Sequence, residues 1–137
     1  MMLHYLLDTD ICSYAIKRKQ PELLSKIRTG LIQEEIAISA ITRGELLYGL
    51  EILPDATTLK LAVHAFLAYL PCLEWPVSAA GHYARLRGAQ KTTGNLVGYM
   101  DTLIACHALA ENLILVTNNE RDFPRIPGLR IENWAAY

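Results

Sequence analysis

Three acidic residues stand where a carboxylate could do chemistry: Asp8, Glu45 and Asp101. Asp8 directly follows a short apolar run, Glu45 lies about two helical turns beyond another, and Asp101 lies where a helical pattern begins. Converging carboxylates bind hard divalent cations such as Mg²⁺ or Mn²⁺, and the ion offsets the repulsion between the acids. The three acids therefore favour metal-assisted phosphodiester hydrolysis, in which the metal activates water and stabilises charge on the phosphate.

Each acid also has a purely structural interpretation. Asp8 could cap the helix that follows it, and Asp101 could serve the dipole of its helix. Glu45 stands three residues after Thr42, which is the spacing of a capping box. The spacing of the acids alone leaves the metal site and these structural roles open.

Strands and helices alternate along the chain, and they must position the acids. Apolar runs predict strands at about residues 4–8, 36–39, 72–75, 113–117 and 129–131. Helical spacing predicts helices after Asp8 (capped by Thr9 or Asp10), from Pro21 to Gly30, after Thr42, at 56–69, from Ser78 to about 91–94 and from about Asp101.

This alternation predicts an α/β fold with three layers, in which helices flank a central, mostly parallel sheet of four to five strands. The ends of the strands after Leu7, Ile38 and Val116 should then lie on one edge of the sheet, where α/β proteins bind their ligands. The acids, although distant in sequence, are expected to meet there.

Composition limits the class of protein further. The chain has 137 residues, of which 52% are hydrophobic and 20% charged, so we expect one compact domain over residues 1–137. It has no apolar run long enough to cross a membrane and no secretory signal. Cys12, Cys72 and Cys106 lack zinc-site spacing and lie in apolar surroundings, which indicates reduced core residues in a cytoplasmic protein.

The net charge of −1 gives no general support for nucleic-acid binding. Such binding would depend on local basic patches, at residues 17–19 or at Arg85, Arg87 and Lys91. Taken alone, each patch is better explained as the solvated end or face of a helix. The sequence also lacks a P-loop and the GxGxxG and GxSxG motifs.

Other functional classes share part of this pattern. In a phosphatase of the haloacid-dehalogenase type, a DxD motif such as residues 8–10 follows a strand, and Asp8 would be the nucleophile. The chain lacks that class's later paired acids and Lys motif and is short for its usual cap. A phosphoacceptor receiver domain fits less well, and a non-catalytic α/β binding module remains a third alternative.

The ordered set of motifs resembles the PIN-domain ribonucleases. The motifs that carry this resemblance are residues 7–10 (LDTD), 42–46 (TRGEL), 98–105 (GYMDTLIA) and 115–119 (LVTNN). Residues 123–129 (FPRIPGL) with Asn133 and Trp134 resemble the VapC toxin branch in particular. The match runs nearly end to end and in the same order, which makes the set specific although each motif alone is weak.

The resemblance implies a Mg²⁺- or Mn²⁺-dependent endoribonuclease that is the toxin of a bacterial toxin–antitoxin pair. Asp8, Glu45 and Asp101 would be its metal-binding acids. The substrate would be structured RNA such as transfer or ribosomal RNA. The partner would be a VapB-like antitoxin that blocks the site, and the toxin would form a homodimer. The apolar helix near residues 56–70 is a candidate surface for the dimer or the partner.

Two positions depart from the family pattern. The fourth acidic position falls on the neutral Asn119, beside Glu120, so that Asn119 could orient a metal-bound water while a second metal would be held less strongly. Position 10 is often Asn or Ser in the family, and Asp10 adds a negative charge. We assign Asp10 to the cap of the first helix; tuning of the metal site and compensation for Asn119 are the alternatives.

Overall fold

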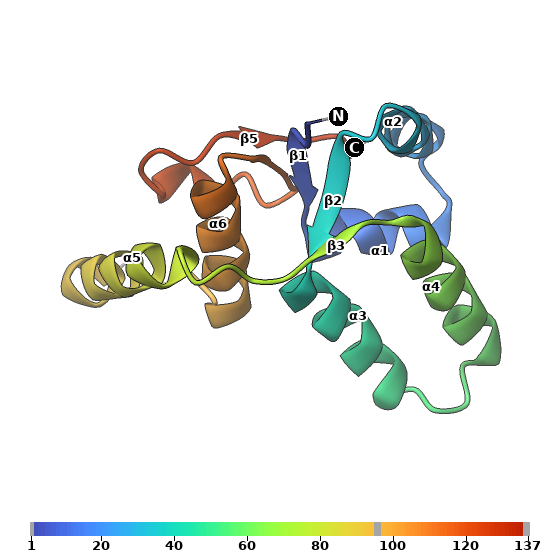
Figure 1. The fold of residues 1–137 in the computed structure, drawn as a ribbon. Coiled ribbons are helices and arrows are strands. Elements are labelled where there is room, and N and C mark those ends of the chain that lie inside the picture. Colours follow the sequence, from blue (N-terminus) through green and yellow to red (C-terminus); the bar gives the residue numbers. More distant parts are fainter. Residues whose placement is uncertain (1, 95–96, 136–137) are drawn as a thin grey trace.

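A five-stranded sheet runs through the centre of the computed structural model, which describes residues 2–94 and 97–135 (Figure 1). Its strands are β1 (Tyr5–Leu7), β2 (Ile36–Ser39), β3 (Cys72–Leu73), β4 (Ile114–Val116) and β5 (Ile131–Glu132). Their order is β3-β2-β1-β4-β5, and every pairing is parallel. Leu7 of the central strand pairs with Ile38 on one side and with Val116 on the other. The predicted α/β fold with a parallel central sheet is confirmed.

Helices cover both faces of this sheet. They are α1 (Thr9–Lys17), α2 (Pro21–Ile32), α3 (Ala40–Glu51), α4 (Thr57–Tyr69), α5 (Ala79–Thr93) and α6 (Tyr99–Glu111), with a 3₁₀ turn, η1 (Phe123–Arg125). Figure 1 shows α6 on one side of the sheet and α1, α2 and α4 on the other, while α5 lies outside α6. The predicted three-layer arrangement is therefore also present.

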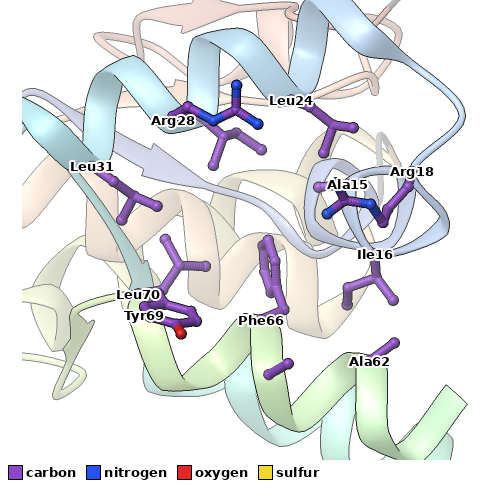
Figure 2. A pocket seen from close by; sticks show the side chains of 12 residues that line it. Ala15, Ile16, Arg18, Leu24, Arg28, Leu31, Ala62, Phe66, Tyr69 and Leu70 are labelled. Atoms are coloured by element: carbon purple, nitrogen blue, oxygen red, sulfur yellow. The ribbon is translucent and has the colours of Figure 1, made fainter. Parts of the chain in front are cut away.

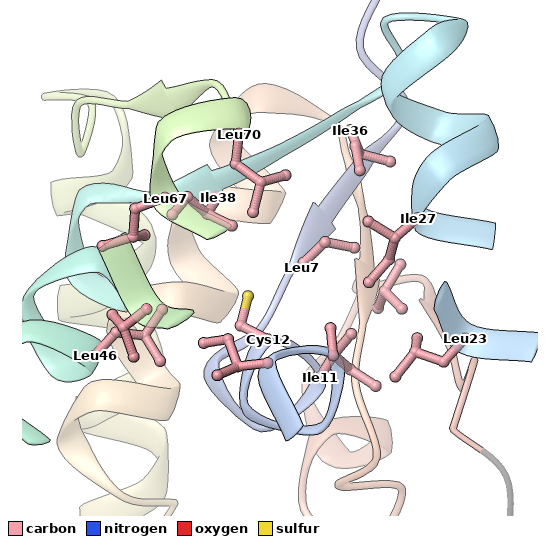
Figure 3. Packing of buried hydrophobic residues seen from close by; sticks show 14 of the residues in the cluster. Leu7, Ile11, Cys12, Leu23, Ile27, Ile36, Ile38, Leu46, Leu67 and Leu70 are labelled. Atoms are coloured by element: carbon pink, nitrogen blue, oxygen red, sulfur yellow. The ribbon is translucent and has the colours of Figure 1, made fainter. Parts of the chain in front are cut away.

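The larger core lies between the sheet and helices α1–α4 (Figure 3). Successive residues of a strand point to opposite faces, so alternate side chains of β1 and β2 enter this core. Its buried members include Leu7, Ile36 and Ile38 from the sheet, Ile11 and Cys12 from α1, Leu23 and Ile27 from α2, and Leu67 and Leu70 around the end of α4. This packing fixes α1, and with it Asp8, against the central strands.

A second core lies on the opposite face of the sheet. Leu6 and Leu115, the neighbours in sequence of the residues in the first core, pack there against Ile104 and Ala105 of α6 and against Phe123. All five side chains are fully buried. This core holds α6, which carries Asp101, against the sheet.

The first helix begins one residue earlier than predicted. Asp8, and not Thr9 or Asp10, is its N-cap, because Asp8 has extended backbone angles and its Oδ1 accepts a hydrogen bond of 3.0 Å from the backbone N–H of Ile11. Asp10 lies in the first turn of the helix and is exposed. The assignment of the cap to Asp10 was therefore wrong.

Two further local predictions need correction. Helix α2 continues past Gly30 to Ile32. A Cβ at Gly30 would lie 2.5 Å from Cγ2 of Ile36, so the glycine permits close packing on β2 and does not end the helix. Helix α3 is capped by Ser39, whose Oγ accepts the N–H of Ile41 at 3.1 Å. Thr42 already lies inside α3, so it is not the helix cap that a capping box with Glu45 requires.

The cysteines match the prediction at two of three positions. Cys12 and Cys106 are buried, whereas Cys72 is exposed because β3 is an edge strand. All three are free thiols. Among the described residues, every helix is too short or too polar to cross a lipid bilayer.

Candidate active site

The carboxyl ends of the central strands bring Asp8 and Thr117 together. The backbone N–H of Asp8 donates to the carbonyl oxygen of Val116 at 2.9 Å, so the residue after β1 and the residue after β4 lie at the same edge of the sheet. The predicted edge for ligand binding is therefore formed by these strand ends.

The carboxylate of Asp8 is held by two hydrogen bonds. Its side chain is only 3% exposed. Oδ1 accepts the N–H of Ile11, and Oδ2 accepts the hydroxyl hydrogen of Thr117. The backbone N–H of Asn119 donates to the same Thr117 hydroxyl oxygen at 2.9 Å. Thr117 is thus fixed from both sides, and it orients Asp8 in turn.

Glu45 lies beside the start of α1. Thr9 donates its hydroxyl hydrogen to Oε1 of Glu45 at 2.6 Å, and the hydroxyl oxygen of Thr42 lies 3.3 Å from that of Thr9. The structure therefore brings Glu45 next to the residue that follows Asp8. The capping-box interpretation of Glu45 is replaced by this contact between α1 and α3.

Asp101 lies in the first turn of α6, as predicted. Burial raises its pKa from 3.8 to about 6, and the negative charges of Asp10, Glu45 and Asp122 add to the shift. Acids from three other parts of the chain thus raise the pKa of Asp101. Together with Asp8 and Glu45 it forms a group of electrostatically coupled carboxylates at one end of the sheet.

Asp8 has the larger pKa shift. Burial raises its pKa from 3.8 to about 7, against the hydrogen bonds from Thr117 and Ile11, which favour the charged form. The charges of Asp10 and Asp101 raise it further. Without a cation, Asp8 therefore keeps its proton to a higher pH than an exposed aspartate does.

Asn119, at the predicted fourth acidic position, contacts Asp122, an acid that the sequence reasoning missed. The side-chain oxygen of Asn119 accepts the backbone N–H of Asp122 at 3.3 Å, and its Nδ2 lies 3.4 Å from Oδ2 of Asp122. Asp122 is also one of the acids that raise the pKa of Asp101. Asn119 thus holds an acid three residues further along the chain, and this Asn-x-x-Asp spacing after a strand was the available signal.

Across residues 2–94 and 97–135, no three His, Cys, Asp or Glu side chains are close enough to hold a metal ion as they stand. The donor set nevertheless fits a hard divalent cation, because its donors are carboxylate oxygens. Asp8 and Asp101, whose pKa values are raised, gain most from a nearby positive charge. Asp8, Glu45 and Asp101 are the residues that could hold it. His107 is fully buried with its Nδ1 2.8 Å from the hydroxyl oxygen of Ser39, so it packs in the protein interior.

Known proteins resemble this chain over nearly its whole length. Residues 5–129 match the PIN domain family. The chain is 38% identical to Ribonuclease VapC2 of Haemophilus influenzae, over 97% of this chain and 99% of that protein. It is 40% identical to the tRNA(fMet)-specific endonuclease VapC of Salmonella typhimurium, over 97% of this chain and 99% of that protein.

A solved structure with the same fold is that of VapBC2 from Rickettsia felis bound to a DNA fragment from their promoter. It superimposes with a TM-score of 0.88 at 35% identity and covers 98% of this chain and 100% of the chain compared. The resemblance thus extends from the sequence motifs to the arrangement of the backbone.

Proposed function

Because the chain belongs to the PIN-domain family and, within it, to the VapC ribonucleases, we propose that it is a metal-dependent endoribonuclease and the toxin of a toxin–antitoxin pair. The observation that carries the metal part of this proposal is the coupling of Asp8 and Asp101, two partly desolvated acids whose pKa values are raised to about 7 and about 6. A haloacid-dehalogenase-type phosphatase is not favoured, since the PIN match covers residues 5–129.

Asp8, Glu45 and Asp101 would hold a Mg²⁺ or Mn²⁺ ion. When bound, the ion activates a water molecule and stabilises the charge that develops on the phosphate and the leaving oxygen. Thr117 keeps the Asp8 carboxylate in a fixed orientation, and Thr9 does the same for Glu45. Such hydrogen-bond partners typically change metal affinity or activity by roughly 10- to 100-fold when removed.

The substrate that we propose is structured RNA, with transfer RNA as the first candidate. A positive charge lies against the first residue of α6, although the chain as a whole is slightly acidic. Arg87 of α5 places its guanidinium 4.0 Å from the ring centroid of Tyr99, which is two residues before Asp101. It also donates to the carbonyl oxygen of Val97 at 2.9 Å. This fixed cation supports binding of RNA phosphates beside the acidic site.

The proposed partner is a VapB-like antitoxin, and a groove between α1, α2 and α4 is our candidate for its binding surface (Figure 2). The groove has a volume of about 430 Å³ and is lined mainly by apolar side chains, among them Phe66 and Leu70. Arg18 and Arg28 also line it. An amphipathic segment with acidic residues beside its apolar face would fit this lining.

The proposed function includes a homodimer. Ile52 and Leu53, at the end of α3, are 59% and 50% exposed, and such side chains favour contact with a second copy. The molar mass of the purified protein, measured by light scattering, tests this part without reference to activity.

The direct test is an RNA cleavage assay. The purified protein is incubated with bulk bacterial RNA and Mg²⁺ or Mn²⁺, beside Asp8→Asn and Asp101→Asn variants and an EDTA control. We expect fragments that require the metal and both acids. Equal cleavage by the wild type and both variants would reject the proposed site, and metal-independent cleavage would reject the proposed cofactor.

A further inference from the structure

A pocket between α3 and the start of α6 opens beside Glu45, and none of the roles assigned above uses it. It has a volume of about 550 Å³ and is lined by Ala40, Ile41, Gly44, Glu45, Tyr48 and Met100. We propose that this pocket binds one unpaired base of the RNA, next to the phosphate that is cut. The proposal rests on the nuclease function proposed above.

The pocket is continuous with the acidic site through Glu45. Glu45, which lines the pocket, is also the residue whose carboxylate accepts the hydroxyl hydrogen of Thr9 at 2.6 Å, beside Asp8. A group in the pocket therefore lies next to the coupled carboxylates. In an RNA whose phosphate is held by a cation there, the adjoining nucleotide is the part of the substrate that reaches the pocket.

The lining of the pocket selects the base over the other parts of a nucleotide. It contains no Lys or Arg side chain, and its one charged group, Glu45, repels a phosphate. Tyr48 and Met100 stand on facing helices and are 65% and 49% exposed, so both side chains are open to a ligand. The flat, apolar face of a base can stack on the tyrosine ring and contact the thioether.

A base in a double helix cannot use this pocket, since both of its faces are covered by neighbouring bases. A volume of about 550 Å³ lies within the range of roughly 300–1,000 Å³ typical of small-molecule sites, so an unstacked base fits. In this proposal, α3 and α6 contact a nucleotide that is looped out or single-stranded.

Gly44 is a position at which mutation can fill the pocket. A Cβ added at Gly44 would meet no atom within 4 Å. Glycine within a helix destabilises it relative to alanine, and neither close packing nor a positive φ requires glycine at this position. A side chain at position 44 therefore enters the pocket without disturbing the core.

The experiment compares two glycines of the same helix. Gly44→Ala and Gly44→Leu narrow the pocket progressively, while Gly49→Ala and Gly49→Leu are the matched controls. Gly49 also has no atom within 4 Å of an added Cβ, but it does not line the pocket. We expect both Ala variants to melt at or above the wild-type temperature, because alanine is the better helix former.

In cleavage of a short RNA that contains the site cut by the wild type, Gly44→Leu should lower kcat/KM by roughly 5- to 150-fold, the range expected for loss of one stacked base. Gly49→Leu should stay within about twofold, as expected for a substitution away from the site. The half-saturating Mn²⁺ concentration should be the same in both Leu variants, because the metal-binding acids are unchanged.

An RNA with an abasic nucleotide on one side of the cut, and a second RNA with it on the other, tests the substrate side. The wild type should cut one of the two abasic RNAs more slowly than the intact RNA. Gly44→Leu should cut that abasic RNA and the intact RNA at the same rate, because its filled pocket no longer binds a base. Equal penalties in both proteins for each abasic RNA would overturn the proposal.

Other occupants of the pocket give different results. If Gly44→Leu, but not Gly49→Leu, dissociates a dimer or weakens antitoxin binding while RNA cleavage is retained, the pocket is a protein interface and the proposal fails. If wild-type cleavage depends on metal and Asp101 but Gly44→Leu cuts as well as Gly49→Leu, the base pocket alone is wrong. A wild type that cuts no RNA rejects the nuclease function itself.

Discussion

The hydroxyl of Thr9 donates a hydrogen bond of 2.6 Å to Oε1 of Glu45, across 36 positions of sequence. This bond joins the first turn of α1 to the second turn of α3. Asp8 precedes Thr9 and caps the same helix, so one residue links the orientations of two proposed metal ligands. The relationship depends on a single side-chain oxygen, which makes it accessible to mutation.

Thr9→Val should weaken metal binding without emptying any space in the core. Valine has nearly the same shape as threonine but cannot donate to Glu45, so the half-saturating Mn²⁺ concentration for cleavage should rise by about 10-fold or more. Thr9→Ser keeps the hydroxyl and is the matched control, expected to stay close to the wild type. Equal values for the Val and Ser variants would show that the bond does not position Glu45.

The raised pKa of Asp8 predicts that the metal-free protein loses stability as the pH rises. The unfolded chain releases the Asp8 proton near pH 4, while burial lets the folded protein keep it until the pKa of about 7. Between these values the folded state binds more protons, so the free energy of unfolding falls with increasing pH. Asp101, with a pKa of about 6, acts in the same direction.

Asp8→Asn removes the buried ionisable group and with it this loss of stability at high pH. In EDTA at pH 8 the variant should melt on the order of 3 °C or more above the wild type, whereas at pH 5 the difference should be smaller. Thermal melts from pH 4 to 8 measure this, with the exposed Asp55→Asn as the control variant. Added Mn²⁺ should stabilise the wild type at pH 8 more than Asp8→Asn. Parallel pH profiles for wild type and Asp8→Asn would contradict the shift.

Asp122 is predicted to contribute to the acidic site through its charge on Asp101. Asp122→Asn should raise the half-saturating Mn²⁺ concentration several-fold, and Asn119→Ala should have a similar effect because Asn119 accepts the N–H of Asp122. Glu120→Gln removes a charge from the same turn and is the comparison. A larger effect of Glu120→Gln than of Asp122→Asn would assign the fourth acid to Glu120.

The groove of Figure 2 predicts which substitutions separate antitoxin binding from RNA cleavage. Tyr69 lines the groove and is 77% exposed, so Tyr69→Asp should fold normally and place a charge against an apolar partner segment. We expect antitoxin affinity, measured by calorimetry, to fall at least about 10-fold, as for a contact worth about 1.4 kcal/mol. Cleavage of RNA by the free toxin should be retained.

Val77→Asp is the matched control for the groove. Val77 is 90% exposed and does not line it. The same added charge at this position should leave antitoxin affinity unchanged. If both Asp variants bind antitoxin as the wild type does, the partner uses another surface.

The sequence predicted those parts of the molecule that local patterns determine. Buried strands show as apolar runs, so the ends of β1 and β4, and therefore the place of Asp8, follow from the order of the amino acids alone. The acids of α3 and α6 followed from helix boundaries and from motif order. Single-residue caps were less predictable, as at Asp8 and Ser39, because several neighbouring polar residues could each accept the first free N–H.

The remaining features depend on tertiary contacts. The bond from Thr9 to Glu45 and the bond from Thr117 to Asp8 join residues that no local pattern connects. Gly30 illustrates the same limit: its position suggested the end of a helix, but the contact that requires it comes from Ile36 of β2. Such positions can be interpreted only when both partners are placed in space.

The order of the strands has a consequence for the cell that makes this protein. The central strand β1 is synthesised first, yet β4, which pairs with it from Tyr5↔Ile114 to Leu7↔Val116, is synthesised near the end. Thr117 and Asp122, which support the acids, leave the ribosome later still. A nascent chain therefore carries Asp8 without the residues that orient it, and we expect nuclease activity only after translation is nearly finished.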